Sequence, residues 1–352
     1  MQTLGWGVSR ASRWFQRFRS RASQRMNEAL LTVWGERLIN VFPNWPFLAA
    51  RRLFARRLVE SDAPRLPVLL SLAAFSKRIP TSVSEFALLG WPHLKFANVD
   101  SVSARLIYWT GDHWVAQHAA GVGLWEQLCR RAETIVELGA NIGYYTVVGG
   151  AAAAGTYAAY EPHPRSCSAL RGNLAINGLD PLVTVIEAAA VPEQSMSAVE
   201  LVCPTGIDRA TPAGAMVRGS FYDDDPNRAT ESFTVPAVPF TDVIAGCDLL
   251  KIDVEGLEAR LLTSAWDELL DLEPAIMIEV HGHNAELRAV LPQLIRELGA
   301  AVYAMSGDHL VPVGEDVMEG GSLDPFHTWD FLVVPVVRTS LVDGLVRESA
   351  DA

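Results

Sequence analysis

The chain has 352 residues, which is enough for one large α/β domain with an appended segment. Hydrophobic residues make up 49% of it and charged residues 20%, so a largely disordered polypeptide is excluded. The net charge of −12 argues against nucleic acid as a partner, because an acidic protein repels a phosphate backbone.

Charge is unevenly distributed along the chain. Residues 1–60 hold eleven arginines and three glutamates, a net charge of +8, and leave −20 for the remainder. Arginines recur among aromatic side chains at three- and four-residue spacing from Arg10 to Arg25, which predicts a basic amphipathic helix. Three interpretations stay open. Residues 1–30 contact an anionic membrane surface, the helix packs on its own domain or on a second subunit, or it is an organelle-type presequence.

The sequence points to a cytoplasmic location. No apolar run approaches the roughly 18 residues that a membrane span needs, and no apolar signal region indicates secretion. Four dispersed cysteines form no C-x-x-C pair, so neither a zinc site nor a disulfide framework is predicted. Peripheral membrane contact and a homo-oligomer remain open alternatives.

Residues 61–131 lead into the main domain. A short apolar helix is expected over residues 66–75, before Pro80. β-type residues around an Asn98-Val99-Asp100 turn predict a hairpin over residues 93–108, and a helix over residues 126–131 follows. We interpret residues 1–90 as a basic, tryptophan-rich helical extension.

An apolar strand at residues 134–138 runs directly into a glycine turn and a helix. Gly139 and Gly143 allow a tight turn that brings backbone N–H groups against a ligand. Their spacing is not the G-x-G-x-x-G dinucleotide fingerprint, and Glu137 precedes the first glycine by two residues. A carboxylate there favours a ligand with a cationic amino-acid end, such as S-adenosylmethionine, over a phosphate. An ordinary strand-turn-helix without a ligand is the alternative.

The second half of this nucleotide site is expected shortly afterwards. Residues 155–160 predict a strand that ends in Glu161, 24 residues after Glu137, where an acid can bind the two ribose hydroxyls of an adenosine. Pro164 begins a helix that extends through Asn177. A third strand over residues 183–191 places Glu187 near the adenine ring.

Residues 192–248 form an insertion longer than a minimal crossover, and we expect it to make a wall of the substrate site. A hairpin is expected between residues 196–203 and 233–238. The acidic run at residues 223–225 is interpreted as a solvated turn, with a metal or a polyhydroxyl substrate as the alternative ligand.

Two later apolar strands each end in polar residues spaced two apart. Asp253 and Glu255 follow residues 249–252, and Glu279 and His281 follow residues 275–278. Side chains two apart in a strand point to the same side, so these four are expected to converge. Helices over residues 257–270 and 285–298 and strands over residues 301–305 and 331–336 complete the pattern.

In their order along the chain, these motifs resemble the FkbM family of S-adenosylmethionine-dependent O-methyltransferases. The Lys251-Ile-Asp-Val-Glu-Gly256 block is the most specific of them, and residues 136–145, 160–164 and 278–281 with Asn173 and Asn177 complete the set. The similarity covers roughly residues 94–337. We therefore assign residues 91–340 to a methyltransferase domain and residues 341–352 to a tail. The resemblance implies an α/β, class I methyltransferase fold, a Rossmann-like doubly wound sheet of order 3-2-1-4-5-7-6 with strand seven antiparallel.

The resemblance also implies methyl transfer to a hydroxyl of a sugar, a glycolipid or another natural-product scaffold. The expected catalytic residues are Asp253, His281 and Glu255. His281 is the expected general base, while Asp253 fixes the hydroxyl or holds Mg²⁺ together with Glu279. The alternative is that Glu255 and Glu258 cap or salt-bridge the next helix and that His281 is only a loop residue. The expected cofactor contacts are Glu137, Gly139, Ala140, Asn141, Gly143, Tyr144, Glu161, Glu187 and Asp253.

Two other functions compete with this one. A binding or assembly protein could retain the adenosine pocket without turnover, but it would have no use for polar residues at the ends of apolar strands. A Rossmann oxidoreductase is disfavoured by the missing third glycine and by Glu137.

Overall fold

The computed structural model describes residues 84–97, 101–110, 121–204, 214–221, 230–323, 326 and 328–347. The basic amphipathic helix, the helix at residues 66–75 and the acidic run at residues 223–225 lie outside the described residues. The membrane contact of residues 1–30 therefore stays a prediction. Within the described ranges, no helix is both long enough and apolar enough to cross a bilayer.

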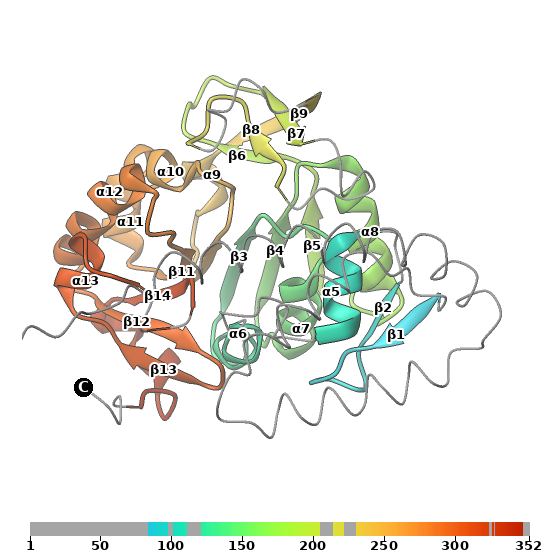
Figure 1. Ribbon diagram of the computed structural model, residues 1–352, viewed down its shortest axis with the longest axis horizontal. Coiled ribbons are helices and arrows are strands. Elements are labelled where there is room, and N and C mark those ends of the chain that lie inside the picture. Colours follow the sequence, from blue (N-terminus) through green and yellow to red (C-terminus); the bar gives the residue numbers. More distant parts are fainter. Residues whose placement is uncertain are drawn as a thin grey trace, which may run out of the picture. The chain divides into compact units, whose positions relative to one another are not determined.

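The domain is built on an eight-stranded sheet of order β13-β12-β14-β11-β10-β3-β4-β5 (Figure 1). Strands β5, β4, β3, β10 and β11 run parallel, whereas β14 is antiparallel to both β11 and β12. The sheet strands are β3 (Thr134–Leu138), β4 (Thr156–Tyr160), β5 (Val183–Ile186), β10 (Leu249–Ile252), β11 (Ala275–Glu279), β12 (Ala301–Ser306), β13 (His309–Pro312) and β14 (Asp330–Val334). The predicted order with an antiparallel strand seven is confirmed, and β13 is an additional edge strand.

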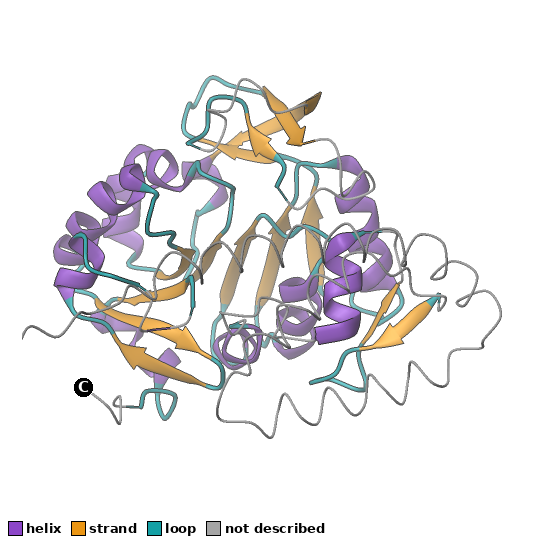
Figure 2. Ribbon diagram, viewed as in Figure 1, coloured by secondary structure: helices purple, strands orange, loops and turns teal. Residues whose placement is uncertain are grey.

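Helices cover this sheet, as Figure 2 shows by colour. They are α5 (Val102–Thr110), α6 (Val122–Cys129), α7 (Tyr144–Ala152), α8 (Pro164–Ala175), α9 (Phe240–Val243), α10 (Glu258–Ser264), α11 (Trp266–Leu272), α12 (Ala285–Glu297), α13 (Glu315–Glu319) and the 3₁₀ helix η4 (Val336–Val342). Leu261 of α10 and Leu294 of α12 join β10 and β11 in one apolar cluster. The middle strands are mostly apolar because both of their faces are covered, and Glu137 of β3 and Lys251 of β10 are buried exceptions.

The hairpin predicted over residues 93–108 is wrong. β1 (Glu85–Ala87) instead pairs with β2 (Lys95–Ala97), and residues 102–110 form α5. The Ser101 hydroxyl accepts a hydrogen bond from the Ala104 N–H at 2.9 Å, so Ser101 acts as an N-cap for α5. The observed hairpin spans residues on both sides of position 90, where the sequence placed the domain boundary.

Two asparagines of α8 and its C-terminal turn attach this hairpin to the domain. Asn173 accepts from the Ala97 N–H at 2.8 Å and donates to the Ile142 carbonyl at 2.7 Å. Asn177 accepts from the Lys95 N–H at 2.8 Å and donates to the Lys95 carbonyl at 2.7 Å, as another strand would. These side chains pair backbone groups at the hairpin edge.

The third strand ends earlier than predicted. β5 stops at Ile186, and β6 (Ala189–Val191) joins a second sheet of order β6-β9-β7-β8. Its other members are β7 (Ala198–Pro204), β8 (Met216–Val217) and β9 (Thr230–Pro239), and the antiparallel pairing of β7 with β9 matches the expected insertion hairpin. This small sheet lies at the top of the view in Figure 1.

The helix predicted over residues 257–270 is divided into α10 and α11. Ala265, with φ −123° and ψ 34°, ends one helix and precedes the next. The predictions for α12, β12 and β14 are confirmed within one or two residues.

Candidate active site

A cavity of about 230 Å³ opens at the carboxyl ends of β3, β4, β10 and β11. This is the edge at which ligands bind in open α/β sheets. Its ionisable lining comprises one ammonium group, that of Lys251, and the carboxyl groups of Glu137, Glu161, Asp253, Glu255, Glu279 and Asp330. Apolar side chains from α5 and the small sheet, among them Ile107, Leu201 and Val217, form another part of the lining.

The glycine turn after β3 owes its shape to contacts within the protein. Gly139 has φ +78°, and a Cβ there would lie 1.7 Å from the Asp253 carbonyl oxygen. The N–H groups of Gly139 and Ala140 donate to the Tyr160 carbonyl at 3.0 and 3.1 Å, so they do not serve as ligand donors. Glycine therefore allows the loops after β3 and β10 to touch at the base of the cavity.

Asn141 follows this turn with φ +49° and lines the cavity. Its N–H donates to Glu161 Oε2 at 2.7 Å, whereas its side-chain Oδ1 is buried and accepts no hydrogen bond. The Oγ of Ser103, which also lines the cavity and belongs to a side chain only 4% exposed, is likewise buried without a partner. Buried polar atoms are normally paired, so two orphans facing one cavity indicate a polar ligand.

Two of the expected cofactor acids are buried and hydrogen-bonded. Glu137 Oε2 accepts from Thr146 Oγ1 at 2.7 Å and from Tyr157 OH at 2.6 Å. Burial raises the pKa of Glu137, against the lowering effect of Lys251 and the two hydroxyl groups. Glu161 accepts from the N–H groups of Asn141 and His163 at 2.7 and 2.8 Å, yet burial raises its pKa to about 7.

Lys251 organises the centre of the cavity. Its Nζ lies 3.1 Å from Asp253 Oδ2 and 4.7 Å from the centroid of the Tyr145 ring, while the Tyr145 hydroxyl donates to Asp330 Oδ2 at 3.0 Å. Burial alone would lower the pKa of Lys251, but the charges of Asp253, Glu137 and Asp330 raise it. The ammonium is therefore kept charged beside Asp253.

The sequence did not single out Asp330 or Tyr145. The signal for Asp330 is its place at the start of β14, directly opposite Glu279 in the antiparallel register. The amino end of an antiparallel strand lies at the same sheet edge as the carboxyl ends of the parallel strands. A polar residue preceding the last strand could thus have been assigned to the site.

The acids after β10 divide into two roles. Glu255, with φ +54°, lines the cavity. Glu258 Oε1 accepts from the N–H groups of Val254 and Gly256 at 3.2 and 3.1 Å, so it ties the loop to α10. Glu258 is thus structural, as in the alternative interpretation, but its side chain binds the loop before α10 and does not cap the helix.

His281 lies behind the cavity lining rather than in it. Its Nε2 is 3.4 Å from Glu279 Oε2, and its ring packs against Trp329, with centroids 4.7 Å apart, and against His283, at 5.4 Å. Burial would lower the pKa of His281, but the carboxylate of Glu279 raises it overall. Glu279 lines the cavity whereas His281 does not, so the imidazole reaches the lining through its contact with Glu279.

Two expected cofactor contacts lie outside the cavity lining. Glu187 is paired with Arg171 at 2.9 Å, because the break between β5 and β6 turns it away, and Ala189 and Ala190 line the cavity in its place. Gly143, with φ +91°, precedes α7, and a Cβ there would lie 2.4 Å from Leu170 Cδ1. Its role is in helix packing.

The other predicted contacts are brought together as expected. Glu137, Gly139, Ala140, Asn141, Tyr144, Glu161, Asp253, Glu255 and Glu279 all line the one cavity. Within the part of the chain that the structure describes, no three His, Cys, Asp or Glu side chains are arranged to hold a metal ion. The geometry thus gives no support to Mg²⁺ held by Asp253 and Glu279.

Residues 137–304 match the family model described as the methyltransferase FkbM domain. No curated protein shows significant sequence similarity to the chain. Among solved structures, methyltransferase FkbM from Methylobacillus flagellatus is 13% identical, with a TM-score of 0.37, over 76% of this chain and 58% of that one. This chain therefore spans less than two thirds of the Methylobacillus protein.

Two other solved structures are O-methyltransferases by their descriptions. A putative O-methyltransferase from Klebsiella pneumoniae is 15% identical over 81% of this chain and 94% of that one, with a TM-score of 0.34. An O-methyltransferase from Bacillus cereus in complex with SAH is 13% identical over 81% of this chain and 97% of that one, with a TM-score of 0.34.

The cavity fits the S-adenosylmethionine that this family implies. Glu161 ends β4, where an acid binds ribose hydroxyls, and the buried Ser103 Oγ and Asn141 Oδ1 are without hydrogen-bond partners in the protein. The acidic lining suits a ligand that carries a sulfonium and an ammonium group. Residues 137–304, which supply most of the cavity lining, are thus similar to the methyltransferase FkbM domain.

Proposed function

We propose that the protein methylates a neutral hydroxyl group on a sugar, a glycolipid or another natural-product scaffold. The observation that carries this proposal is the position of Asp253, an acid that lines the cavity with Oδ2 3.1 Å from the buried ammonium of Lys251. An alcohol needs a proton acceptor when its oxygen becomes an ether, and a fixed carboxylate can fill that role.

S-adenosylmethionine supplies an electrophilic methyl group, whose bond to sulfur breaks with its electron pair as the new bond to oxygen forms. Asp253 accepts the hydroxyl proton on a carboxylate oxygen. Lys251 holds that carboxylate in place, and the Tyr145 ring covers the ammonium from 4.7 Å. His281 acts indirectly, by orienting Glu279 through their 3.4 Å contact.

The charge of the lining favours a neutral acceptor. Six carboxyl groups and one ammonium group face the cavity, so a carboxylate or phosphate acceptor would be repelled. Leu201, Ala215 and Val217 of the small sheet and the loop before it supply an apolar wall for the carbon skeleton beside the hydroxyl.

The test is transfer of label from S-adenosylmethionine to host material. The full chain is incubated with the methyl-labelled cofactor and separated pools of lipids, glycans and small molecules, with Asp253→Asn as the matched control. We expect base-stable label in a neutral product with the wild-type protein only. Base-labile label would identify a carboxyl acceptor and contradict the proposal. Cofactor binding without transfer to any pool would favour the binding or assembly protein.

A further inference from the structure

The cavity concentrates negative charge far beyond what its cation offsets. Five different elements or their following loops, β3, β4, β10, β11 and β14, direct a carboxyl group to it. Lys251 is the cation among the lining residues, and its 3.1 Å contact offsets the charge of Asp253. Glu279 and Asp330 lie opposite each other in the sheet register. The His281 imidazole lies 3.4 Å from Glu279, and the charge of Lys251 lowers the pKa of Asp330, but neither carboxylate has a direct ammonium contact among the ion pairs of the described residues.

These carboxyl groups also affect one another. Burial is the largest cause of the raised pKa of Glu161, Glu279 and Asp330, and the negative charge of Asp253 raises each of them further. A cation entering the cavity would relieve this repulsion, whereas a neutral ligand of the same shape would not.

The two nucleosides of the reaction differ in this respect. S-adenosylmethionine carries a positive sulfonium, and its product S-adenosylhomocysteine has a neutral thioether in the same place. They share the adenosine and the amino-acid end, so every contact to those parts contributes equally to both affinities. The difference between the two affinities therefore measures how strongly the cavity stabilises the positive charge on sulfur, together with the contacts of one methyl group.

We propose that this cavity binds the sulfonium cofactor more tightly than its thioether product by charge, and that Asp330 is a specificity-determining residue for this discrimination. The inference rests on the proposed use of S-adenosylmethionine. Weaker binding of S-adenosylhomocysteine favours its release after methyl transfer, so inhibition of the enzyme by this product is reduced.

The charge of Asp330 can be tested by an isosteric substitution that preserves its hydrogen bonds. A single oxygen, Oδ2, accepts from Tyr145 OH at 3.0 Å and from the Gly121 N–H at 3.4 Å. The amide oxygen of an asparagine in this place could accept both hydrogen bonds, so Asp330→Asn removes the charge and preserves the packing. Asp330 also lies outside residues 137–304, the range of the family match.

The experiment is calorimetric titration of the full-length chain with each nucleoside at low salt and about pH 8, above the pKa of about 7 of Glu161. For the wild-type protein we expect S-adenosylmethionine to bind on the order of tenfold more tightly than S-adenosylhomocysteine. Asp330→Asn should reduce that ratio by about threefold or more, through weaker binding of the cation and unchanged binding of the thioether.

The control is Asp308→Asn, which neutralises an exposed carboxylate in the turn between β12 and β13 and should leave the ratio unchanged. If Asp330→Asn melts at a clearly lower temperature, Glu279→Gln provides a second test, because it removes a cavity carboxylate from the neighbouring strand. Equal affinities of wild type for both nucleosides, or an unchanged ratio in the folded variants, would overturn the inference while leaving the cofactor assignment intact. Failure of the wild type to bind either nucleoside would overturn the proposed function and the inference together.

Discussion

The two ends of the central sheet use carboxylates in opposite ways. At the amino end, Asp248 accepts from the N–H groups of Glu133 and Thr134 at 3.0 and 2.8 Å, and Arg338 lies 3.9 Å away. At the carboxyl end, six carboxyl groups share a cavity with one lysine, and two buried polar oxygens have no partner. Polar groups are satisfied by the protein at one end, while at the other end they are left for a ligand.

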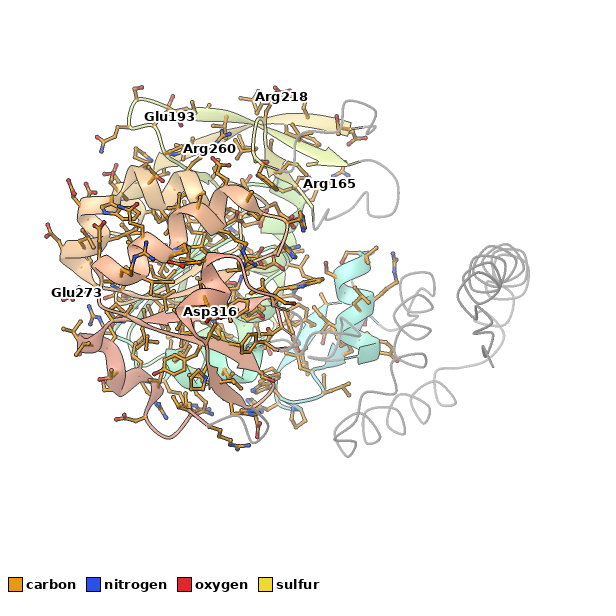
Figure 3. The ribbon with its side chains drawn as sticks, turned by 60° about the vertical axis from the view of Figure 1, so that its left-hand side comes forward. Arg165, Glu193, Arg218, Arg260, Glu273 and Asp316 are labelled. Atoms are coloured by element: carbon orange, nitrogen blue, oxygen red, sulfur yellow. The ribbon has the colours of Figure 1, made fainter. Side chains whose placement is uncertain are left out.

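The comparison separates structural acids from functional ones. Both ends belong to the same strands, and these strands are stabilised mainly by burial of their apolar residues. Acids at the strand ends are therefore not needed for the strands to form. The Asp248 carboxylate supports the fold through its backbone hydrogen bonds, whereas burial raises the pKa of Glu161, Glu279 and Asp330 at the cavity, so their ionisation opposes the fold. On the outside of the domain, where Figure 3 shows Arg218 and Arg260, acids form a third class: Glu200 and Glu286 pair with these two arginines in half-exposed ion pairs.

The largest effect is expected for Gly139→Ala, which forces apart two loops at the cavity end. Its Cβ would lie 1.7 Å from the Asp253 carbonyl oxygen at a φ of +78°, so the loops after β3 and β10 must separate. We expect no measurable binding of S-adenosylmethionine in calorimetry and a loss of several kcal/mol in the free energy of unfolding. The matched control is Gly172→Ala in α8, where an added Cβ would meet no atom of another element within 4 Å. It should preserve binding and add up to about 1 kcal/mol of stability. Normal binding by Gly139→Ala would show that the loop contact is dispensable.

Next comes the pair Asp253→Asn and Asp248→Asn, which compares the two ends directly. Asp253→Asn should lower turnover on the order of a hundredfold or more with little change in stability, because the proton acceptor is lost. Asp248→Asn should cost about 1–3 kcal/mol of stability, because one of two backbone N–H groups loses its acceptor, and should leave turnover intact.

Single-turnover rates and chemical denaturation of both variants provide the measurement. Loss of the same property in both variants would contradict the different roles of the two sheet ends. His281→Ala tests a second residue near the cavity end. Since His281 lies behind Glu279, its effect on turnover should be smaller than that of Asp253→Asn.

A moderate effect is expected for Glu258→Gln on the pH dependence of stability. Burial raises the pKa of Glu258 from 4.5 to about 7. Between these values the folded protein binds more protons than the unfolded chain, so stability is highest below about pH 4.5 and is lost as the pH rises through 7. Glutamine does not ionise, so above pH 7 the variant should be more stable than wild type by on the order of 1–3 kcal/mol.

Denaturation curves at pH 4.5 and pH 8 test this sign for Glu258→Gln. The control is Glu268→Gln on the exposed face of α11, which should follow the wild-type pH dependence. A variant that is less stable than wild type at pH 8 would mean that the ionised Glu258 supports the fold.

The smallest effect is expected for Arg260→Gln on the surface. Arg260 of α10 pairs with Glu286 of α12 at 3.3 Å, with side chains 47% and 36% exposed. Solvent screens such a pair, so the free energy of unfolding should change by less than about 0.5 kcal/mol. A loss of more than about 1 kcal/mol in the free energy of unfolding would mean that this surface pair stabilises the fold as Asp248 does at the amino end.

The sequence predictions that the structure confirmed depended on short patterns that indicate how strands and turns are arranged in the whole domain. Largely apolar strands, the glycine turn after Glu137 and polar residues two apart after β10 and β11 indicated a doubly wound sheet and most of the cavity lining, whereas the strand order came from the resemblance to the FkbM family. The failures came where local preference was overruled. Residues 102–110 have β-type character but form α5 behind the Ser101 cap, and Glu187 was placed on a strand that breaks beside it.

Sequence patterns and the resemblance to the FkbM family were sufficient to predict a class I methyltransferase sheet and the convergence of Glu137, Glu161, Asp253 and Glu279 at one edge of it. The sequence patterns are local, because strand ends and glycine turns lie next to the side chains they direct. The tertiary structure was needed to show that Asp330 also lines the cavity, that His281 does not, and that Lys251 is the ammonium beside Asp253. Those outcomes depend on strand order and on burial, which bring together residues such as Glu137 and Asp330, 193 positions apart, and set their charges through mutual distance.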